Sequence, residues 1–379
     1  MKLKNIKLIN FRSYEEISLD FQPGINIFIG NNGSGKTNIL EAIYVLSLTK
    51  SNRLSSDFGL IKNGFNNLIV SGEVIYDDYI KKYQVQIDKF GKKVYINNFQ
   101  IKKISEYISN FCVTSFLPND IEIIKGSPSV RRNVLNIQIG QIYNQYLKYV
   151  NEYNTLLKMR NEYLKRLNIN SFSDTKYLDI INEKMIAISI KIYYFRFFYI
   201  NEINKIMPKI FYKLSGIKDL KIEYSNNLGI NSYDEVKIKD ILLNKYKKNL
   251  TKELMQGMTL TGLHRDDLLF LLNNQDASIY ASQGQQRLIV IAYKIAELLV
   301  FKSEKGEYPV LLLDDCFSEI DIKKRNNIIK YLNNEMQVII TTTDLEDISL
   351  DLVKCAKIFN IKNGTIKIKG GVKNARKNK

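Results

Sequence analysis

The chain has 379 residues, of which 45% are hydrophobic and 25% charged, as is ordinary for a folded protein with a large core and two structural units. This composition excludes a largely disordered chain. The 56 Lys and Arg residues outnumber the 39 Asp and Glu residues, and the net charge of +17 with a pI near 9.4 favours contact with a polyanion such as nucleic acid. AT-rich codons also enrich Lys, Asn and Ile, so charge alone leaves nucleic-acid binding and composition bias equally open.

The N-terminal residues MKLKNIKLIN alternate and carry charge, unlike a signal peptide, and no apolar run approaches the roughly 18 residues of a membrane span. Cys112, Cys316 and Cys355 lie far apart without paired spacing, which argues against a disulfide framework and against a zinc site. We therefore expect a cytoplasmic protein with no membrane partner.

The first recognisable unit is a strand, a loop and a helix within INIFIGNNGSGKTNILEAIYVLSL. Apolar residues predict a buried strand over 25–29 and a helix over 39–46. Between them, Gly30, Gly35, Lys36 and Thr37 fill the phosphate-loop template G-x-x-x-x-G-K-[ST]. In such a loop the backbone N–H groups surround the phosphates, the lysine supplies charge to the β and γ oxygens, and the threonine hydroxyl is offered to Mg²⁺.

The middle of the chain predicts first strands and then long helices. Residues 65–117 contain alternating segments that are typical of antiparallel hairpins. Apolar residues then recur every three or four positions over 130–167 and over 177–214, which predicts two long amphipathic helices. The segment IKDLKIEY is predicted to be a short strand returning toward the phosphate-binding head, and Lys237–Gln256 another helix.

This order predicts an α/β head, with a mixed sheet, helices and an antiparallel β lobe, into which a helical arm is inserted. We place the first part of the head at 1–125, the arm at 126–258 and the second part of the head at 259–368. Residues 369–379 form a basic tail that we expect to be disordered.

A helix with a polar beginning is predicted in YASQGQQRLIVIAYKIAEL. Ser282, Gln283, Gly284 and Gln285 come first, and apolar residues follow at helical spacing. The unpaired N–H groups of such a helix start favour an anion. The sequence raises the question of which anion this helix meets, because the phosphate loop lies far earlier in the chain.

A carboxylate pair follows the apolar run in EYPVLLLDDCFSEID. The run Val310–Leu313 is typical of a strand buried on both faces, and Asp314 and Asp315 come at its end. We assign Asp314 to Mg²⁺ and Asp315 to orienting or deprotonating the attacking water.

The order of these motifs is similar to that of ATP-binding-cassette (ABC) ATPases, and over nearly its full length the chain resembles the RecF family of bacterial recombinational repair, in the SMC-like branch of that superfamily. The resemblance rests on INFRSYEEISLDFQPGINIFIGNNGSGKTNILEAIYVLS, SFLPNDIEIIKGSPSVRRNVL, LTGLHRDDL, ASQGQQR, LLLDDCFSEID and TTTD. It implies an ABC-type P-loop ATPase head with an inserted helical arm.

The resemblance also implies roles for single residues. Asp315 and Lys36 would be catalytic, Thr37 and Asp314 would hold Mg²⁺, and Ser318–Asp321 would form a D-loop between subunits. ATP would be bound by the phosphate loop and by the signature helix of a second copy, that is, by Gly30, Asn31, Asn32, Gly33, Ser34, Gly35, Lys36, Thr37, Ser282, Gly284 and Gln285.

Two departures from the cassette pattern suggest slow hydrolysis. Asp315 stands where most cassette ATPases have glutamate, and Thr343 where they have the switch histidine. The resemblance therefore implies a weak, DNA-stimulated ATPase that acts as a switch. The single histidine, His264, is interpreted as structural in preference to catalytic, because no zinc-type cluster or nucleophile accompanies it.

The implied function is an ATP-dependent homodimer that binds duplex or gapped DNA and loads recombinase with the mediators RecO and RecR. A transporter ATP-binding subunit is disfavoured, because 282 − 37 = 245 residues separate the signature from the phosphate loop. An SMC-type chromosome structural protein lacks its long coiled coil here. A fused nuclease is disfavoured because only 379 − 344 = 35 residues follow Asp344.

Overall fold

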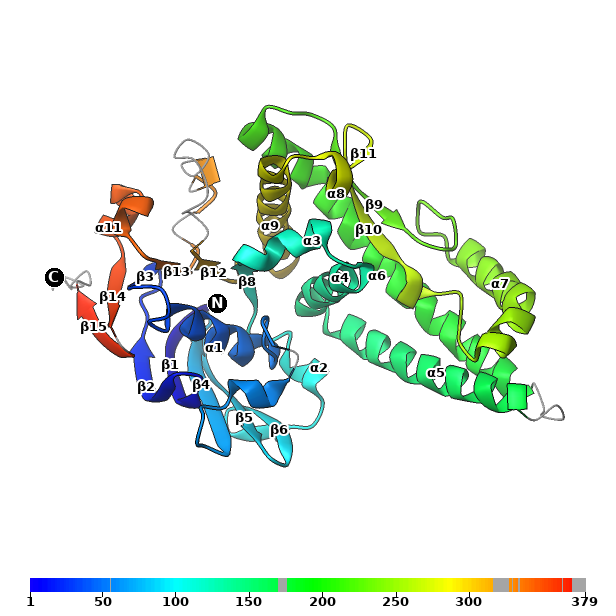
Figure 1. Ribbon diagram of the computed structural model, residues 1–379, viewed down its shortest axis with the longest axis horizontal. Coiled ribbons are helices and arrows are strands. Elements are labelled where there is room, and N and C mark those ends of the chain that lie inside the picture. Colours follow the sequence, from blue (N-terminus) through cyan, green and yellow to red (C-terminus); the bar gives the residue numbers. More distant parts are fainter. Residues whose placement is uncertain are drawn as a thin grey trace. The chain divides into compact units, whose positions relative to one another are not determined.

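The computed structural model describes residues 1–54, 56–169, 176–315, 327–328, 330–332, 335–362 and 364–369 (Figure 1). The chain forms two units. The first comprises Met1–Asp120 with Lys294–Lys379, and the second comprises Ile121–Tyr293.

The first unit is built on a six-stranded sheet with the order β15-β14-β3-β13-β12-β8. All neighbouring strands are parallel except β14 and β15. Every residue of β12 and β13 is buried, as expected for strands covered on both faces. The strands are β3 (Ile25–Ile29), β8 (Val113–Phe116), β12 (Val310–Asp314), β13 (Val338–Thr342), β14 (Lys357–Lys362) and β15 (Thr365–Lys369).

An antiparallel sheet with the order β2-β1-β4-β5-β6-β7 forms a second layer of this unit. Helix α1 (Lys36–Leu48) is almost wholly buried and contacts strands of both sheets. The hairpins predicted over 65–117 are confirmed for β4 to β7, whereas β8, at the end of that range, pairs in parallel with β12. The strands of this sheet are β1 (Lys2–Phe11), β2 (Tyr14–Asp20), β4 (Asn67–Ile75), β5 (Ile80–Asp88), β6 (Gly91–Ile96) and β7 (Phe99–Ile101), and the short elements of the unit are η1 (Asp57–Leu60), α2 (Ile104–Tyr107), η2 (Pro118–Ile121), η4 (Leu345–Asp347) and α11 (Leu350–Lys354).

The second unit combines long helices with a three-stranded antiparallel sheet of order β11-β10-β9. Its helices are α3 (Glu122–Lys125), α4 (Pro128–Ile142), α5 (Asn144–Ile169), α6 (Lys176–Ser215), α7 (Glu235–Gln256), η3 (Leu263–Arg265) and α8 (Ala277–Tyr280), and its strands are β9 (Leu220–Ser225), β10 (Asp267–Leu272) and β11 (Gln275–Asp276). The division between the units then falls inside helix α9 (Gln283–Lys305).

The helices predicted over 177–214 and 237–256 are confirmed by α6 and α7. The single helix predicted over 130–167 is wrong, because α4 ends at Ile142, the next residue, Tyr143, has extended backbone (φ −124°, ψ 102°), and α5 starts at Asn144. One extended residue scarcely disturbs an apolar spacing of three or four, so periodicity did not reveal the break.

The compact units differ in one place from the predicted domain boundaries. The first division, after Asp120, lies close to the predicted boundary at 125/126, but residues 259–293 group with the helical unit. The reason is the pairing of β10 with β9, which keeps the predicted strand IKDLKIEY and its partner in the second unit. Residues 370–379 of the predicted basic tail lie outside the described residues.

The chain leaves the first unit after Asp120 and returns to it at Lys294, and these two residues are neighbours within that unit. Lys294 Nζ lies 3.8 Å from Asp120 Oδ1 and 3.7 Å from Glu297 Oε2, and all three side chains are largely buried. Burial would lower the pKa of Lys294, but the carboxylates of Asp120 and Glu297 raise it above its ordinary value. The lysine therefore stays charged and links the two crossing points.

Candidate nucleotide-binding site

The phosphate loop connects β3 to α1, as predicted. Gly35 has a left-handed φ of 108°, and a Cβ there would lie 2.5 Å from Tyr14 Oη. A Cβ at Gly30 would lie 2.4 Å from the carbonyl oxygen of Ile361. Both positions therefore require glycine. Asn31, Asn32 and Gly33 are exposed, and Ser34 Oγ is buried without a hydrogen-bond partner among the described residues, so a phosphate oxygen would suit it.

Lys36 lies inside this loop. Its ammonium donates to the carbonyl oxygens of Gly30 and of Asn31, the latter at 3.0 Å, and the residue is 7% exposed. Burial lowers the pKa of Lys36, and the nearby carboxylates of Asp315 and Asp314 oppose that shift. The side chain thus holds a positive charge within the curve of the loop.

Thr37 and Asp314, the predicted metal ligands, are in contact. Thr37 Oγ1 donates to Asp314 Oδ1 at 3.0 Å, and Thr341 Oγ1 donates to the same oxygen at 2.6 Å. A hydroxyl and a carboxylate are the ligands that Mg²⁺ prefers, with water and phosphate oxygens completing its shell. The residues present therefore fit a nucleotide-bound Mg²⁺. No cluster of three or more His, Cys, Asp or Glu residues that could hold a metal occurs in the part of the chain that the structure describes.

Asp315 has an unusual backbone at the end of β12. Its φ of 46° is left-handed, and its N–H donates to Thr341 O at 3.2 Å and to Thr341 Oγ1 at 3.1 Å. This conformation, which Asp and Asn adopt more readily than other residues with a Cβ, turns the chain sharply at the end of β12. The structure therefore brings Lys36, Thr37, Asp314 and Asp315 together at the carboxyl ends of β3 and β12, on either side of β13.

The other residues predicted from the cassette pattern have separate places. Thr343 is exposed just after β13, and the predicted D-loop, Ser318–Asp321, lies outside the described residues together with Cys316. Ser282, Gly284 and Gln285 belong to the second unit, whereas the phosphate loop belongs to the first.

The start of α9 is exposed and capped by its own side chains. Ser282 N–H donates to Gln285 Oε1 at 2.8 Å, and Gln285 N–H donates to Ser282 Oγ at 3.3 Å, which is a capping box. Ser282, Gln283 and Gly284 are exposed, and a Cβ at Gly284 would meet nothing within 4 Å. The helix start can therefore approach an anion outside its own chain.

Sequence reasoning missed several residues beside the phosphate loop. Tyr14 Oη donates to Gly35 O at 3.1 Å, and Ser13 Oγ accepts from Asn38 Nδ2 at 3.0 Å. Arg12 pairs with the buried Glu41 of α1 through two hydrogen bonds of 2.8 Å. These residues lie within the quoted segment INFRSYEE and in α1, but apolar spacing cannot single them out.

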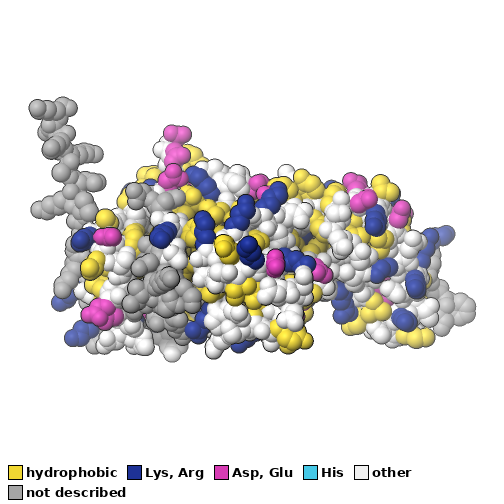
Figure 2. Space-filling view, turned by 90° about the horizontal axis from the view of Figure 1, so that it is seen from above, with side chains coloured by type: hydrophobic (Ala, Val, Ile, Leu, Met, Phe, Trp, Pro, Cys, Tyr) yellow, Lys and Arg dark blue, Asp and Glu magenta, His cyan; other side chains and the backbone are white. Residues whose placement is uncertain are grey.

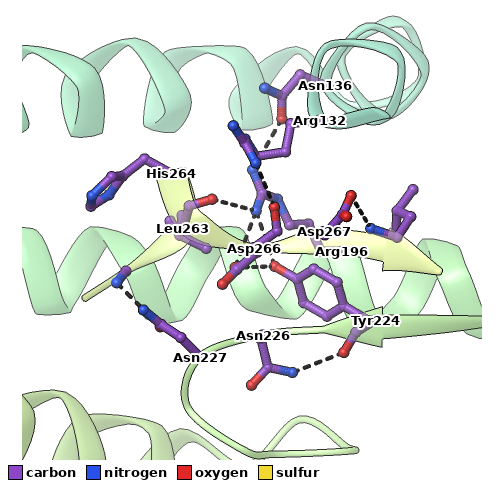
Figure 3. A network of polar contacts seen from close by, with 12 residues as sticks. Arg132, Asn136, Arg196, Tyr224, Asn226, Asn227, Leu263, His264, Asp266 and Asp267 are labelled. Atoms are coloured by element: carbon purple, nitrogen blue, oxygen red, sulfur yellow. Dashed lines mark hydrogen bonds and ion pairs between the residues drawn. The ribbon is translucent and has the colours of Figure 1, made fainter. Parts of the chain in front are cut away.

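The segment LTGLHRDDL forms a polar network inside the second unit (Figure 3). Asp266 is fully buried and accepts from Tyr224 Oη at 2.6 Å and from Arg196 Nη1 at 3.4 Å. The carbonyl oxygen of Asp266 accepts from Arg132 Nη1 at 2.7 Å. Asp267 binds Arg131 through two hydrogen bonds of 2.6 and 2.7 Å. The two carboxylates therefore join β10 to helices α4 and α6.

His264 belongs to the same network and has the structural role predicted for it in preference to a catalytic one. Its Nε2–H donates to Thr259 O at 3.0 Å, so Nδ1 accepts from Tyr153 Oη at 2.9 Å. Burial lowers the pKa of His264 to about 4, and the positive charges of Arg265, Arg132 and Arg160 contribute to the lowering. The imidazole is therefore neutral in the folded protein at neutral pH.

This neutral histidine predicts an acid-sensitive second unit. The pKa of His264 is about 4 when folded and 6.5 ordinarily, so between these values the unfolded chain binds more protons. Stability is then fully present above pH 6.5 and falls as the pH drops toward 4, by up to about 3 kcal/mol. Denaturant titrations at pH 5 and 7 measure the change. His264→Gln should reduce this pH dependence of stability, and an equal pH dependence in the variant would contradict the assignment to His264.

Comparison with known proteins places this site in a family. The family model described as RecF/RecN/SMC N terminal domain matches residues 2–367. The DNA replication and repair protein RecF of Lactobacillus johnsonii is 39% identical over 372 residues, 97% of this chain and 100% of that protein. This chain belongs to the RecF family of DNA replication and repair proteins. The RecF of Staphylococcus carnosus is 37% identical over 368 residues, with 97% and 100% of the two chains covered.

Solved structures of RecF have the same fold. The recombination mediator protein RecF-ATP in the RecFOR pathway matches with a TM-score of 0.90 and 34% identity, covering 97% of this chain and 98% of that one. The Smc head bound to the C-winged helix domain of ScpA matches with a TM-score of 0.54 and 15% identity over 97% of each chain, which concerns the fold alone. The predicted α/β fold, an ABC-type ATPase head with an inserted helical unit, is confirmed. Among the described residues of this RecF family member, no helix has the length and apolarity needed to cross a membrane.

Proposed function

We propose that this chain is an ATP-dependent switch that dimerises on ATP, binds duplex or gapped DNA and promotes recombinase loading in recombinational repair and replication restart. The observation that carries the proposal is the contact between Thr37 Oγ1 and Asp314 Oδ1 at 3.0 Å, next to a lysine held inside a phosphate loop. The likeness to RecF-ATP supports ATP as the nucleotide.

Each residue of the site has a proposed task. The N–H groups of Gly30–Gly35 surround the phosphates, and Lys36 places its charge on the β and γ oxygens. Bound Mg²⁺, held by Thr37 and Asp314, would neutralise charge on the same phosphates. Asp315 orients and deprotonates the attacking water, and its short side chain makes hydrolysis slow, as a switch requires.

The binding site around the γ-phosphate is completed by a second copy of the chain. Ser282 and Gly284 stand at an exposed helix start, whose N–H groups and dipole favour an anion. A two-fold dimer would give two composite sites, each with the phosphate loop of one copy and the Ser282 helix of the other. ATP would then hold the dimer together, and hydrolysis would release it.

DNA is the proposed macromolecular ligand, because the chain combines a net charge of +17 with membership in a DNA replication and repair family. Lys and Arg side chains are spread over the face shown in Figure 2. The mediators RecO and RecR are the proposed protein partners, supported by the RecFOR pathway named for the matching structure. We place the protein in the cytoplasm.

The proposed function predicts DNA affinity that depends on salt and ATP but hardly on sequence. No base-reading motif such as a zinc finger is present in the sequence, so phosphate contacts should dominate. With several phosphates neutralised, affinity for mixed-sequence duplex should fall at least about 100-fold between 50 and 200 mM salt. Fluorescence anisotropy with and without Mg²⁺-ATP measures both effects.

Two comparisons decide this test. ATP should strengthen DNA binding if closure of the dimer creates the binding surface, and a gapped duplex should bind at least as well as an intact one. A flat salt response, or equal affinity with and without ATP, would contradict the proposed switch and leave the positive charge as composition bias.

A further inference from the structure

Helix α7 of the second unit carries a lysine-rich face that the nucleotide chemistry does not use. Its exposed lysines form no ion pair with any residue that the structure describes, and they are Lys237, Lys239, Lys247, Lys248 and Lys252. At about 100° per residue, Lys237, Lys247, Lys248 and Lys252 share one side of the helix, and Lys239 lies on another. Lys245, half-buried, donates to the carbonyl oxygen of Asn227 instead. The exposed cations are therefore available to a ligand.

The acidic residues of α7 do not balance this charge. Glu235 and Asp240 lie in its N-terminal part. Glu253 is fully buried, where its carboxylate binds Arg160 at 2.7 Å and accepts from Leu260 N–H at 2.7 Å. The surface of α7 after Asp240 thus exposes lysine but no carboxylate. None of these lysines lies in the last turn, so the helix dipole does not explain them.

The positive surface continues beyond the end of α7. The side chain of Lys165 on α5 lies against Gly257, where a Cβ would be 2.7 Å from Lys165 Cγ. Arg265 is exposed, and its Nη2 lies 3.4 Å from Thr259 O and 3.7 Å from Met258 Sδ. Arg265 therefore differs from its neighbours in LTGLHRDDL, whose side chains are committed to the internal network.

The basic residues of α7 are denser than those of α6. Helix α7 has six basic and three acidic residues in 22, whereas α6 has seven basic and three acidic residues in 40. On α6, Asp179 and Glu183 are exposed, and Glu202 forms an ion pair with Lys205. On α7, Glu235 and Asp240 are the exposed carboxylates, and both lie before the lysines of its C-terminal half.

We propose that this face of α7, with Lys165 and Arg265, contacts the sugar-phosphate backbone of duplex DNA. The inference rests on the proposed DNA binding and locates its surface. Lys237 and Lys252 are separated by about 22 Å along the helix axis, which matches roughly six base pairs of B-DNA at 3.4 Å each. Lysine contacts phosphates as a point charge, so the surface binds DNA without reading its sequence.

The test replaces three exposed lysines of α7 together, Lys247→Gln, Lys248→Gln and Lys252→Gln. If each lysine contacts one phosphate, the slope of log affinity against log salt should become less steep by about 2.7, since each contact contributes about 0.9. Affinity for mixed-sequence duplex at low salt should fall at least about tenfold. Replacing the same lysines by arginine should preserve both values.

The matched control is Lys184→Gln, Lys209→Gln and Lys213→Gln on α6, which removes the same charge from exposed positions of the same unit. The control should change the salt slope by less than about 1 and affinity by less than about threefold. Equal losses in both triple variants, or wild-type binding by the α7 variant, would overturn the proposal while leaving DNA binding itself intact. A wild-type chain without salt-dependent DNA binding would overturn both this proposal and the proposed function.

Discussion

Lys36→Ala should weaken ATP binding by roughly 100- to 10,000-fold, because two charge-assisted contacts to phosphate are lost at about 1.5–3 kcal/mol each and 1.4 kcal/mol corresponds to a factor of ten. Lys36 is held inside the phosphate loop by the carbonyl oxygens of Gly30 and Asn31, so its charge is already placed where phosphates would lie. Little further ordering is needed on binding, and the full effect should appear in the affinity.

Titration calorimetry with Mg²⁺-ATP measures this affinity, and thermal unfolding without nucleotide checks the fold. Lys89→Ala, at an exposed position of the same unit, is the control and should bind as the wild type does. If Lys36→Ala binds ATP within about threefold of the wild-type affinity, the phosphate loop is not the ATP-binding site.

Ser282→Arg should leave ATP binding by the monomer unchanged and abolish both ATP-induced dimerisation and turnover. Ser282 is exposed in the second unit, whereas the phosphate loop belongs to the first. Its backbone N–H and its side chain cap the start of α9 through Gln285. Arginine removes the cap and adds bulk where the helix start must approach the γ-phosphate held by the other copy.

Sedimentation in the Asp315→Asn background measures dimerisation without hydrolysis. The Asp315→Asn chain should bind ATP, stop at the bound state and sediment as a dimer, and adding Ser282→Arg should return it to a monomer. Gln283→Arg adds the same side chain one residue later without removing the cap, so it should still dimerise. A monomer of the Asp315→Asn chain at saturating ATP would reject the composite site.

Mixing the Lys36→Ala and Ser282→Arg variants is a second test of the composite site. In a mixed dimer both defects fall in one composite site, and the other site keeps an intact lysine and an intact serine. Turnover should return in the mixture although neither variant alone hydrolyses ATP. Two strictly coupled sites would show no turnover even in the mixed dimer. The sedimentation result is therefore the decisive test of the composite site.

Local sequence was sufficient for the strand, loop and helix around Lys36 and for the apolar strand before Asp314, because each has a continuous pattern within a few residues. It also predicted the two residues proposed to hold Mg²⁺, Thr37 and Asp314, which are in contact. Their contact depends on parallel pairing across the sheet, in which β13 lies between β3 and β12. Thr341, on that intervening strand, was missed because its role exists only once the strands are ordered.

The role of LTGLHRDDL could not be predicted from its sequence either, because its partners come together only in the folded chain. The carboxylate of Asp266 accepts a hydrogen bond from Arg196, 70 residues earlier, and that of Asp267 accepts from Arg131, 136 residues earlier. A buried pair of this kind stabilises only when both partners are in place, because the loss of one leaves the other charge without compensation. Sequence spacing showed the motif but not its partners.

The neighbouring positions of Asp120 and Lys294 make the whole of Ile121–Tyr293 a long insertion whose ends are already together in the first unit. For the first unit this insertion is the closure of a loop, whose entropic cost grows only with the logarithm of its length. The helical unit could therefore lengthen, shorten or change its surface in related chains while the strands carrying Lys36 and Asp314 kept their pairing. The proposed DNA-contacting surface of α7 can thus change independently of Lys36 and Asp314, whereas Ser282, in the same insertion, stays tied to the proposed ATP site.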